Sequence, residues 1–330
     1  MVFYERAASY YARRRDFISC NFCELVLYSS WSDIRNRALA DMRDSDVVIN
    51  SSYCPEGAAI CDDALAVATL HVFYDLDTPV TLQGLVDGGV EYLRADQVPE
   101  FDLCLSWCGG KILRELEQRW GAQRARPLYG CVDPDVHVRV DVPERYRCTM
   151  SYMGTYAADR QDKFERLFLA AAESKPEETF VLAGSQYPQQ SSPSNVRHFE
   201  HVSPHDHPAL YSSSKFTLNI TRKGMARAGY CPSGRLFEAA ACGTPIVSDW
   251  FTGLNQFFVP GEEILVAQDT PDVLQALEIG DSERDKLGQR AREHTLTEHT
   301  GDHRARELVA YLEQARSLRR ASSSSVAEVA

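Results

Sequence analysis

Short apolar runs alternate with amphipathic, helix-like segments along almost the whole chain. The strand-like runs of the first half are 25–28, 46–50, 70–74, 101–106 and 126–129, and those of the second half are 149–153, 180–183, 196–198, 216–220, 246–248 and 264–266. Strands that alternate with helices form parallel sheets with helices on both faces. The sequence therefore predicts an α/β protein, whose ligands should bind at the carboxyl ends of the strands.

The length of the chain favours two domains, because 330 residues exceed what one ordinary core holds. Residues 130–148, rich in Pro, Asp and Val, have the composition of a linker. We expect two doubly wound, Rossmann-like domains over 1–138 and 139–300, which face a central cleft. A helix over 301–318 and a disordered Ser- and Ala-rich tail over 319–330 should follow.

Charge and cysteine usage narrow the class of protein. The net charge of −12 argues against a general basic face that binds nucleic acid. The sequence has no apolar run long enough to span a membrane, and Glu5 and Arg6 interrupt the start where a signal peptide is apolar. We expect a cytoplasmic protein whose ten cysteines are reduced thiols. A metal or redox role for the C-x-x-C pair Cys20 and Cys23 is the alternative.

Residues 229–254, GYCPSGRLFEAAACGTPIVSDWFTGL, combine a turn, a short helix and a buried strand. The turn at 232–234 precedes a helix over 235–242, for which Gly243 supplies the C-cap. A helix N-terminus attracts phosphate, and the carboxylate of Glu238 can accept hydrogen bonds from sugar hydroxyls. This segment therefore predicts a site for a ligand that carries both phosphate and ribose.

The same segment carries a resemblance to known proteins. Its run LFEAAACGTPIVSD resembles the donor-site signature of group-1 glycosyltransferases. The wider segment 218–267 is similar to the CgeB-like (spore maturation protein) glycosyltransferase family, and that resemblance covers residues 2–300. It implies a GT-B arrangement, in which the N-terminal domain takes the acceptor, the C-terminal domain takes the nucleotide-sugar and the last helix crosses back. It also implies metal-independent sugar transfer with no cofactor beyond the donor.

Two positions depart from the pattern that the resemblance implies. The chain begins at what resembles the second strand of the first domain, VFYER, so we expect its first strand, loop and helix, about 30 residues, to be missing. Either the start is assigned too late or the protein is a shortened member. In relatives with an E-x7-E motif the first glutamate stands where this chain has Tyr230.

Both departures favour an alternative, a non-catalytic nucleotide- or sugar-binding protein of a spore or envelope on the same fold. A DNA-modifying glycosyltransferase is a third hypothesis. The acidic net charge weighs against it, because neutralisation of phosphates dominates such binding. We therefore expect a nucleotide-sugar and an unknown acceptor as partners.

The resemblance assigns donor-binding roles to residues at strand ends and around the motif. Glu238 is expected to hold the ribose hydroxyls, and the cations and glycine turns are expected to hold the diphosphate. The alternatives are a glutamate that complements the helix dipole, solvated surface cations, an Arg235–Glu238 pair and ordinary turns. The candidates are Arg222, Lys223, Gly154, Thr155, Gly184, Ser233, Gly234, Arg235, Glu238, Gly243 and Thr244.

The acceptor side is expected at the strand ends of the first domain. Asp75 and Asp77 form a D-L-D after a strand and are candidates for the catalytic base. Capping of the next helix is their alternative role. Ser106, Gly109 and Gly110 precede a helix and could hold an anion or simply form a tight turn.

No metal site is expected. His201, His205 and His207 include an H-x-H spacing, but they lie in a polar segment between a strand and a helix. We interpret that segment as a turn.

Overall fold

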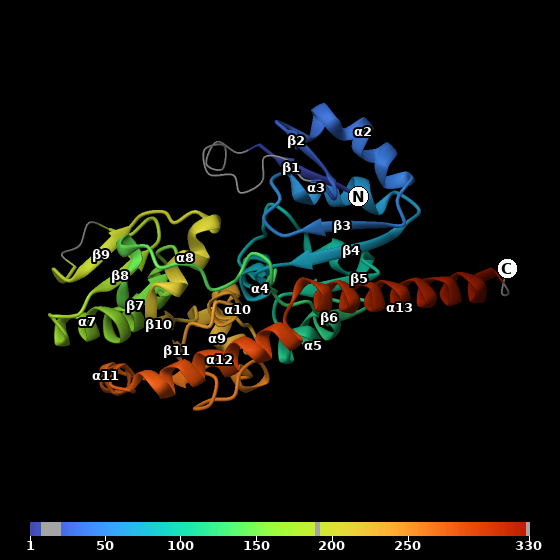
Figure 1. Cartoon of the computed structure of the whole chain (residues 1–330). Coiled ribbons are helices and arrows are strands. Elements are labelled where there is room, and N and C mark those ends of the chain that lie inside the picture. Colours follow the sequence, from blue (N-terminus) through green and yellow to red (C-terminus); the bar gives the residue numbers. More distant parts are fainter. Residues whose placement is uncertain (8–20, 189–191, 328–330) are drawn as a thin grey trace. The chain divides into compact units, whose positions relative to one another are not determined.

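The computed structural model describes residues 1–7, 21–188 and 192–327. It divides the chain into two compact units (Figure 1). The first unit comprises Met1–Tyr129 and Arg306–Ala330, and the second comprises Gly130–Ala305. In the described part of the chain, no helix is both long and apolar enough to cross a membrane.

Parallel strands form the sheets of the first unit, with the predicted α/β alternation. A four-stranded sheet has the order β3-β4-β5-β6, and β1 pairs with β2 in a separate two-stranded sheet. The strands are β1 (Val2–Arg6), β2 (Glu24–Tyr28), β3 (Val47–Ser51), β4 (Leu70–Asp75), β5 (Leu103–Ser106) and β6 (Ala125–Pro127). The helices are α2 (Trp31–Arg43), α3 (Gly57–Leu65), α4 (Thr78–Val86), η1 (Ala95–Glu100) and α5 (Lys111–Gln118).

The order of the four-stranded sheet differs from a doubly wound pattern, because it runs in sequence without a reversal. The β1–β2 pair builds a cluster of its own instead of extending that sheet. Tyr28 of β2 packs there with Trp31 and Ala38 of α2 and with Ile60 of α3. This small apolar cluster joins the β1–β2 pair to α2 and α3.

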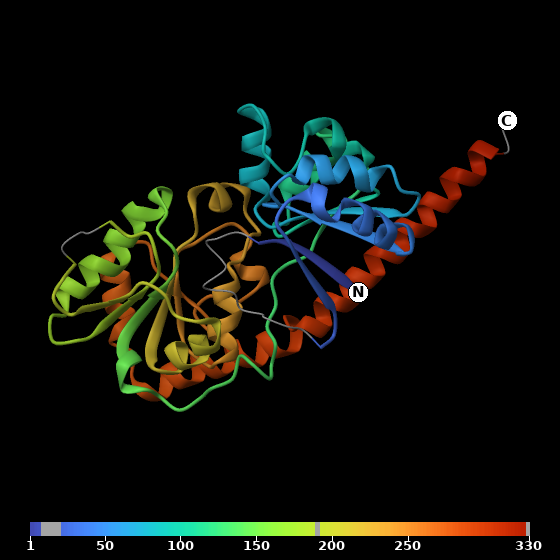
Figure 2. The same cartoon turned by 90° about the horizontal axis from the view of Figure 1, so that it is seen from above.

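The long helix α13 (Gly301–Ala327) packs against the four-stranded sheet of the first unit. Figure 2 shows it as one uninterrupted red helix. Its Ala315 is 1% exposed and belongs to the same core cluster as Leu70 and Leu105 of the sheet. The helix residues in this cluster all follow Arg306 and belong to the first unit.

The disordered tail expected from residue 319 is wrong over 319–327, where the helix continues. Arg319 donates to Asp102 Oδ2 at 2.7 Å and also to the Thr69 carbonyl, which holds this turn on the sheet. The run that follows contains neither Gly nor Pro, so nothing in its backbone ends the helix. Residues 328–330 lie outside the described residues.

The second unit is a doubly wound domain. Its six parallel strands have the order β12-β11-β10-β7-β8-β9. They are β7 (Cys148–Met153), β8 (Phe180–Ala183), β9 (Val196–Phe199), β10 (Ser214–Asn219), β11 (Ile246–Ser248) and β12 (Leu265–Val266). Strand order reverses between β7 and β10, and loops that leave such a switch point diverge and leave room for a ligand.

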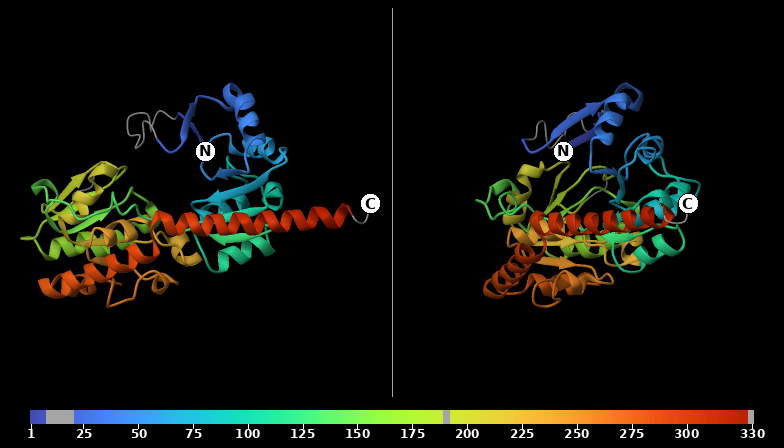
Figure 3. Two further views of the ribbon diagram at one scale, coloured as in Figure 1. Left: turned by 45° about the vertical axis from the view of Figure 1, so that its right-hand side comes forward. Right: turned by 90° about the vertical axis from the view of Figure 1, so that its right-hand side faces the viewer.

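Helices cover both faces of this sheet, as Figure 3 shows. One face carries η3 (Ala158–Arg160), α6 (Gln161–Phe164), η4 (Glu165–Leu169), α7 (Ala170–Ser174) and α11 (Thr270–Leu277). The other elements are η2 (Glu144–Tyr146), η5 (Pro204–Asp206), α8 (His207–Ser212), α9 (Lys223–Ala228), α10 (Gly234–Ala241), η6 (Leu254–Gln256) and α12 (Asp281–Glu298). Among these, α10 packs on α8 and α12.

Aromatic packing forms the centre of the second unit. Phe164 and Phe168 are stacked with ring centroids 5.1 Å apart, and Phe168 meets Phe180 edge-on at 5.7 Å. Tyr152 of β7 touches both Phe164 and Phe168. Because Tyr152 lies near the carboxyl end of β7, this core fixes the strand end where the site begins.

We expect truncation of a buried valine in this core to destabilise the second unit. Val273 of α11 is fully buried, so Val273→Ala removes packed methyl groups and should lower the free energy of unfolding by roughly 2 kcal/mol. The matched change Val259→Ala, at a side chain that is 43% exposed, should stay within about 0.5 kcal/mol. Urea unfolding of both variants measures the difference, and equal effects would contradict this account of the core.

Candidate functional site

Two backbone turns meet at the carboxyl ends of β7 and β8. The amide of Gly154 donates to the Ala183 carbonyl at 2.8 Å, and that of Tyr156 donates to the Ser185 carbonyl at 3.0 Å. A Cβ atom on Gly184 would lie 2.1 Å from the Gly154 carbonyl oxygen. Only glycine permits this approach, so the predicted glycines 154 and 184 are brought together and have a structural reason to be there.

Three arginines gather around the Gly154 turn. A Cβ on Gly154 would lie 2.9 Å from Nη2 of Arg235 and 3.1 Å from Nη2 of Arg160. Both guanidinium groups lie over the Tyr152 ring, at 5.6 and 5.8 Å from its centroid. Arg222, which precedes α9, pairs with Asp159 at 3.4 Å beside them. We call Arg160, Arg222 and Arg235 the arginine cluster.

Arg160 is the buried member of the arginine cluster, with 8% of its surface exposed. Its Nη2 donates to the Thr155 carbonyl, whereas its Nε has no hydrogen-bond partner in residues 1–7, 21–188 and 192–327. Burial lowers the pKa of Arg160, and the neighbouring positive charges of Arg235 and Arg222 lower it further. Such desolvated and mutually repelling cations favour an anionic ligand.

Glu238 lies on α10, one turn after Arg235. Its Oε2 is 3.4 Å from Nδ1 of His207 and accepts a hydrogen bond from the Tyr211 hydroxyl at 3.3 Å. Burial by itself would raise the pKa of Glu238, but His207, His137 and Arg235 together bring it below the ordinary value. The side chain keeps 24% of its surface exposed, so Glu238 is an ionised carboxylate that a ligand can reach.

Arg235 does not serve as a simple ion-pair partner of Glu238. Its Nη1 donates to Asn219 Oδ1 at 3.2 Å, at the carboxyl end of β10. This contact directs the guanidinium toward the Gly154 turn. Arg235 and Glu238 thus present a cation and an anion from one helix, three residues apart.

The N-terminus of α10 stays open beside these groups. Ser233 is its N-cap residue, but the Ser233 side chain makes no capping hydrogen bond. Gly234 is the first helical residue, and the amide of Leu236 donates to the Ser233 carbonyl at 3.0 Å. The two amides before Leu236, those of Gly234 and Arg235, can still donate to an anion.

Gly243 and Thr244, expected at the donor site, lie at the opposite end of α10 and have packing roles. Gly243 adopts φ +70, and its carbonyl oxygen would be 2.3 Å from a Cβ on Gly288 of α12. Thr244 is buried and donates through Oγ1 to the Tyr211 carbonyl at 2.7 Å. Helix termination and close helix packing account for both residues without a ligand, and their donor-binding role stays a prediction.

The contacts that Lys223 and Tyr230 make are with other protein groups. Lys223 is 52% exposed and pairs with Asp162 at 3.1 Å, as the solvated-charge alternative predicts. The Tyr230 ring packs on Gly253, and its amide donates to the Thr252 carbonyl at 2.6 Å. The position where an E-x7-E motif has its first glutamate therefore holds a packing residue.

Sequence reasoning missed two cations of this region. Arg160 is one, although it lies only six residues after the Gly154 that marked the loop. Lys163 is the other: it pairs with the buried Asp249, which also accepts from the amide and hydroxyl of Thr221 at 2.9 Å. The sequence could have indicated both cations, because they follow closely after the Gly154 turn at the carboxyl end of β7.

In the first unit, Asp75 lies inside the protein and not at a surface that receives ligands. It is 3% exposed, and its Oδ1 accepts from the Asp77 amide at 3.1 Å and from Thr81 Oγ1 at 2.9 Å. It borders an internal cavity of about 10 Å³ among core residues. This placement argues against Asp75 as a catalytic base. Asp77, whose Oδ2 accepts from the Tyr53 hydroxyl at 2.7 Å, stays a candidate.

The turn expected on the acceptor side, which begins at Ser106, is stabilised by hydrogen bonds within the protein. Ser106 is fully buried, and its Oγ bonds Thr78 Oγ1 at 2.7 Å and accepts from the Cys108 amide at 3.0 Å. Gly109 and Gly110 follow and lead into α5. These bonds join the carboxyl ends of β4 and β5 and satisfy Ser106 within the protein.

The other sequence-predicted groups are placed as follows. His207 joins Glu238, and within the described residues no three His, Cys, Asp or Glu side chains form a metal-binding group. Cys23 is partly buried, whereas Cys20 lies outside the described residues.

Residues 160–310 match a family model described as glycosyl transferase-like. Curated proteins yield no match. Three solved structures share the fold. Sucrose-phosphate synthase from Thermosynechococcus elongatus is 13% identical, with a TM-score of 0.67 over 96% of this chain and 89% of that one. HepE from Anabaena, in complex with UDP-glucose, is 10% identical, with a TM-score of 0.63 over 88% and 86%.

An alpha-glucosyltransferase in complex with UDP-glucose and abasic-site DNA is 15% identical, with a TM-score of 0.70 over 94% of this chain and 90% of that one. The α/β fold with parallel sheets, expected from the alternating strands and helices, is thereby confirmed as one shared with GT-B glycosyltransferase structures.

Burial of Asp75 predicts a pH dependence of stability. Burial raises the pKa of Asp75 from 3.8 to about 6. Between these two pH values the folded protein keeps the carboxyl proton that the unfolded chain has released. This contribution to stability is complete below the lower pKa and is lost as the pH rises through the higher one, in total about 3 kcal/mol. Asp75→Asn keeps an acceptor oxygen and cannot ionise.

The free energy of unfolding of Asp75→Asn minus that of the parent protein should therefore increase by up to about 3 kcal/mol between about pH 4 and pH 7. Urea titrations across this pH range measure the difference. A difference that does not change with pH would contradict the buried, protonated Asp75.

Proposed function

We propose that this protein is a glycosyltransferase that binds a nucleotide-sugar in its second unit and transfers the sugar to an acceptor hydroxyl. The observation that carries the proposal is the arginine cluster around the Gly154 turn, with ionised Glu238 one helical turn beyond Arg235. The match of residues 160–310 to a glycosyl transferase-like model supports it, since that range includes all four side chains.

The spacing of these groups suits a nucleoside diphosphate. Arg235 and Glu238 are separated by three residues on α10, so their Cβ atoms lie about 5–6 Å apart on one face. A diphosphate held by Arg235, Arg160 and the open α10 amides would leave its ribose beside Glu238. There the carboxylate accepts hydrogen bonds from the two ribose hydroxyls.

The same cations would supply the chemistry of the leaving group. In the transfer, the bond between the anomeric carbon and the diphosphate oxygen breaks and a bond to the acceptor oxygen forms. The electron pair of the broken bond stays on the diphosphate, and fixed guanidinium groups stabilise that developing charge. Three arginines provide this positive charge from the protein itself, which supports a reaction without a required metal. Asp77 is our candidate for the group that takes the acceptor proton.

Finer assignments are part of the proposal. The CgeB-like resemblance supports a hexosyltransferase, and the UDP-glucose in two structures of similar fold supports a uridine nucleotide as the donor. The cysteine usage and the charged start of the sequence support a cytoplasmic protein. The competing hypothesis is a protein that binds the nucleotide-sugar without turnover. Release of UDP from UDP-glucose, with and without saccharide acceptors, separates the two.

DNA is a second candidate acceptor, because an alpha-glucosyltransferase of similar fold has been solved with DNA. The net charge of −12 opposes it. We expect no transfer of labelled glucose to duplexes with hydroxymethylated bases at physiological salt. Labelled DNA would establish this acceptor instead.

Removal of a member of the arginine cluster should weaken nucleotide binding. Arg160→Ala and Arg235→Ala each delete a charge-assisted contact, so we expect the Kd for UDP to increase by at least about tenfold. Isothermal titration calorimetry measures both. Lys215→Ala, at an exposed cation of the same unit that pairs with Glu178 at 3.9 Å, is the control and should bind like the parent. Equal binding by all three variants would refute the donor site.

Removal of the Glu238 charge should weaken the binding of a ligand that has a ribose and leave the binding of a bare diphosphate unimpaired. Glu238→Gln keeps the size of the side chain and removes the charge, so the Kd for UDP should rise by about tenfold. The Kd for inorganic pyrophosphate, which has no ribose, should stay the same or fall slightly, because a repelling carboxylate is gone. A parallel loss of both ligands would contradict the ribose role and indicate a general disturbance of α10.

A further inference from the structure

Glu238, the residue proposed to hold the ribose, is itself held by a neighbouring helix. His207 and Tyr211 are separated by one turn of α8, so they share a face, and α8 packs on α10. Nδ1 of His207 is 3.4 Å from Glu238 Oε2, and the Tyr211 hydroxyl donates to the same oxygen at 3.3 Å. Both of these contacts use Oε2, so a ribose hydroxyl can approach Oε1.

The two groups that contact Glu238 are fixed by packing. Tyr211 is fully buried, and its carbonyl accepts from Thr244 Oγ1 at 2.7 Å. The rings of His207 and Tyr211 meet edge-on, with centroids 6.5 Å apart. Because Thr244 follows directly after the end of α10, its hydrogen bond ties α8 to the helix that carries Glu238. The imidazole and the hydroxyl therefore meet the carboxylate at a set position.

His207 also affects the charge of Glu238. Burial raises the pKa of Glu238, and the hydrogen bond and positive charge of His207 oppose burial more strongly than His137 and Arg235 do. Other ionisable groups on the surrounding elements are Tyr211 of α8, Cys242 at the end of α10 and Arg292 of α12. Without His207 the effect of burial would be less opposed, and a protonated Glu238 would be a poorer acceptor for ribose hydroxyls.

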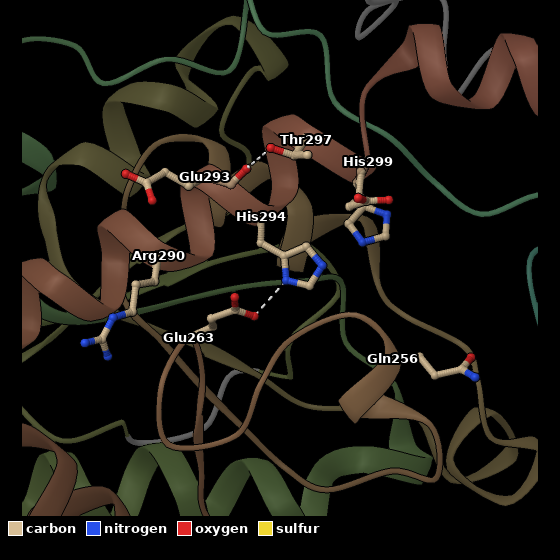
Figure 4. A pocket seen from close by; sticks show the side chains of 8 residues that line it. Gln256, Glu263, Arg290, Glu293, His294, Thr297 and His299 are labelled. Carbon is tan, nitrogen blue, oxygen red and sulfur yellow. Dashed lines mark hydrogen bonds and ion pairs between the residues drawn. The ribbon is translucent and has the colours of Figure 1, made fainter.

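A second histidine–glutamate pair in the same unit has a structural role. His294 of α12 lies 2.8 Å from Glu263, as Figure 4 shows, and their side chains are 25% and 14% exposed. Oε2 of Glu263 also accepts from the Val259 amide at 2.7 Å, so this glutamate ties its own loop to α12. The His207–Glu238 pair has a similar exposure, 20% and 24%, but it lies one helical turn from Arg235 of the arginine cluster.

We propose that His207 is a positioning residue for the nucleotide-sugar, because it holds the Glu238 carboxylate in the orientation that accepts the ribose hydroxyls. The inference rests on the proposed donor site. His207 acts through Glu238, and Tyr211 supports the same oxygen. The second histidine of the H-x-H spacing thereby has a function as the partner of a carboxylate.

Isothermal titration calorimetry of the full chain with UDP and with inorganic pyrophosphate tests this role. His207→Leu removes the donor, so the Kd for UDP should rise by about fivefold, whereas the Kd for pyrophosphate, which has no ribose, should change by less than about twofold. His207→Asn restores a donor close to the position of Nδ1 and should recover most of the affinity. The controls His205→Leu, at an exposed neighbour, and His294→Leu, in the matched pair, should bind UDP like the parent.

Two further measurements separate positioning from a general disturbance of the fold. Because His207 acts through Glu238, the double variant His207→Leu/Glu238→Gln should bind UDP as weakly as Glu238→Gln alone. Carbon-13 NMR of carboxyl-labelled glutamate follows Glu238 directly, since its signal is the one that Glu238→Gln lacks. The pKa of Glu238 measured in this way should be higher in His207→Leu than in the parent and unchanged in His294→Leu, because burial is then less opposed only in the first variant.

Four results would each overturn the inference: UDP binding by His207→Leu equal to that of the parent, a parallel loss of pyrophosphate binding, additive effects in the double variant, or no recovery in His207→Asn. If Arg160→Ala, Arg235→Ala and Glu238→Gln all leave UDP binding unchanged, the donor-site proposal fails and this inference fails with it. If those three variants weaken UDP binding and His207→Leu does not, only the role of His207 is refuted.

Discussion

The close approach of the turns after β7 and β8 underlies the arrangement of the second unit's site. The neighbouring parallel strands β7 and β8 end side by side. Because Gly184 has no side chain, the Gly154 carbonyl oxygen occupies space that a Cβ atom at position 184 would need. The chain then leaves Gly154 toward η3 and brings the Arg160 guanidinium over the Tyr152 ring. A larger residue at position 184 would push the two turns apart and move this guanidinium with them.

Electrostatic repulsion gives the site its chemical character. Three guanidinium groups gather there, and within the described residues only Arg222 has a carboxylate partner, Asp159. The aromatic core keeps Arg160 desolvated, so its charge is not screened as a surface charge would be. Folding therefore holds positive charge in place before any ligand arrives, and a preorganised field of this kind stabilises developing negative charge.

Polar groups at the strand ends of the two units behave differently. In the first unit, Asp75 and Ser106 are satisfied by the hydrogen bonds that they make within the protein. In the second unit, the buried Nε of Arg160, beyond the carboxyl end of β7, has no hydrogen-bond partner among the described residues. A ligand can satisfy such a donor, but unpartnered buried polar atoms also occur in the first unit, at Asn50 Oδ1 and Trp120 Nε1, so the orphan donor marks a ligand site only together with the cations around it.

The sequence by itself determined the strands, their alternation with helices and the position of Glu238 and Arg235 on one helix. Periodicity and turn chemistry are local, so neighbouring residues are enough to specify them. Only the tertiary structure decided the rest. It buried Asp75 in the first unit. It also brought Arg160 to Arg235 and packed the last helix on the sheet of the first unit. Each of these outcomes depends on which distant segments pack together, and this long-range packing is not visible in a local pattern.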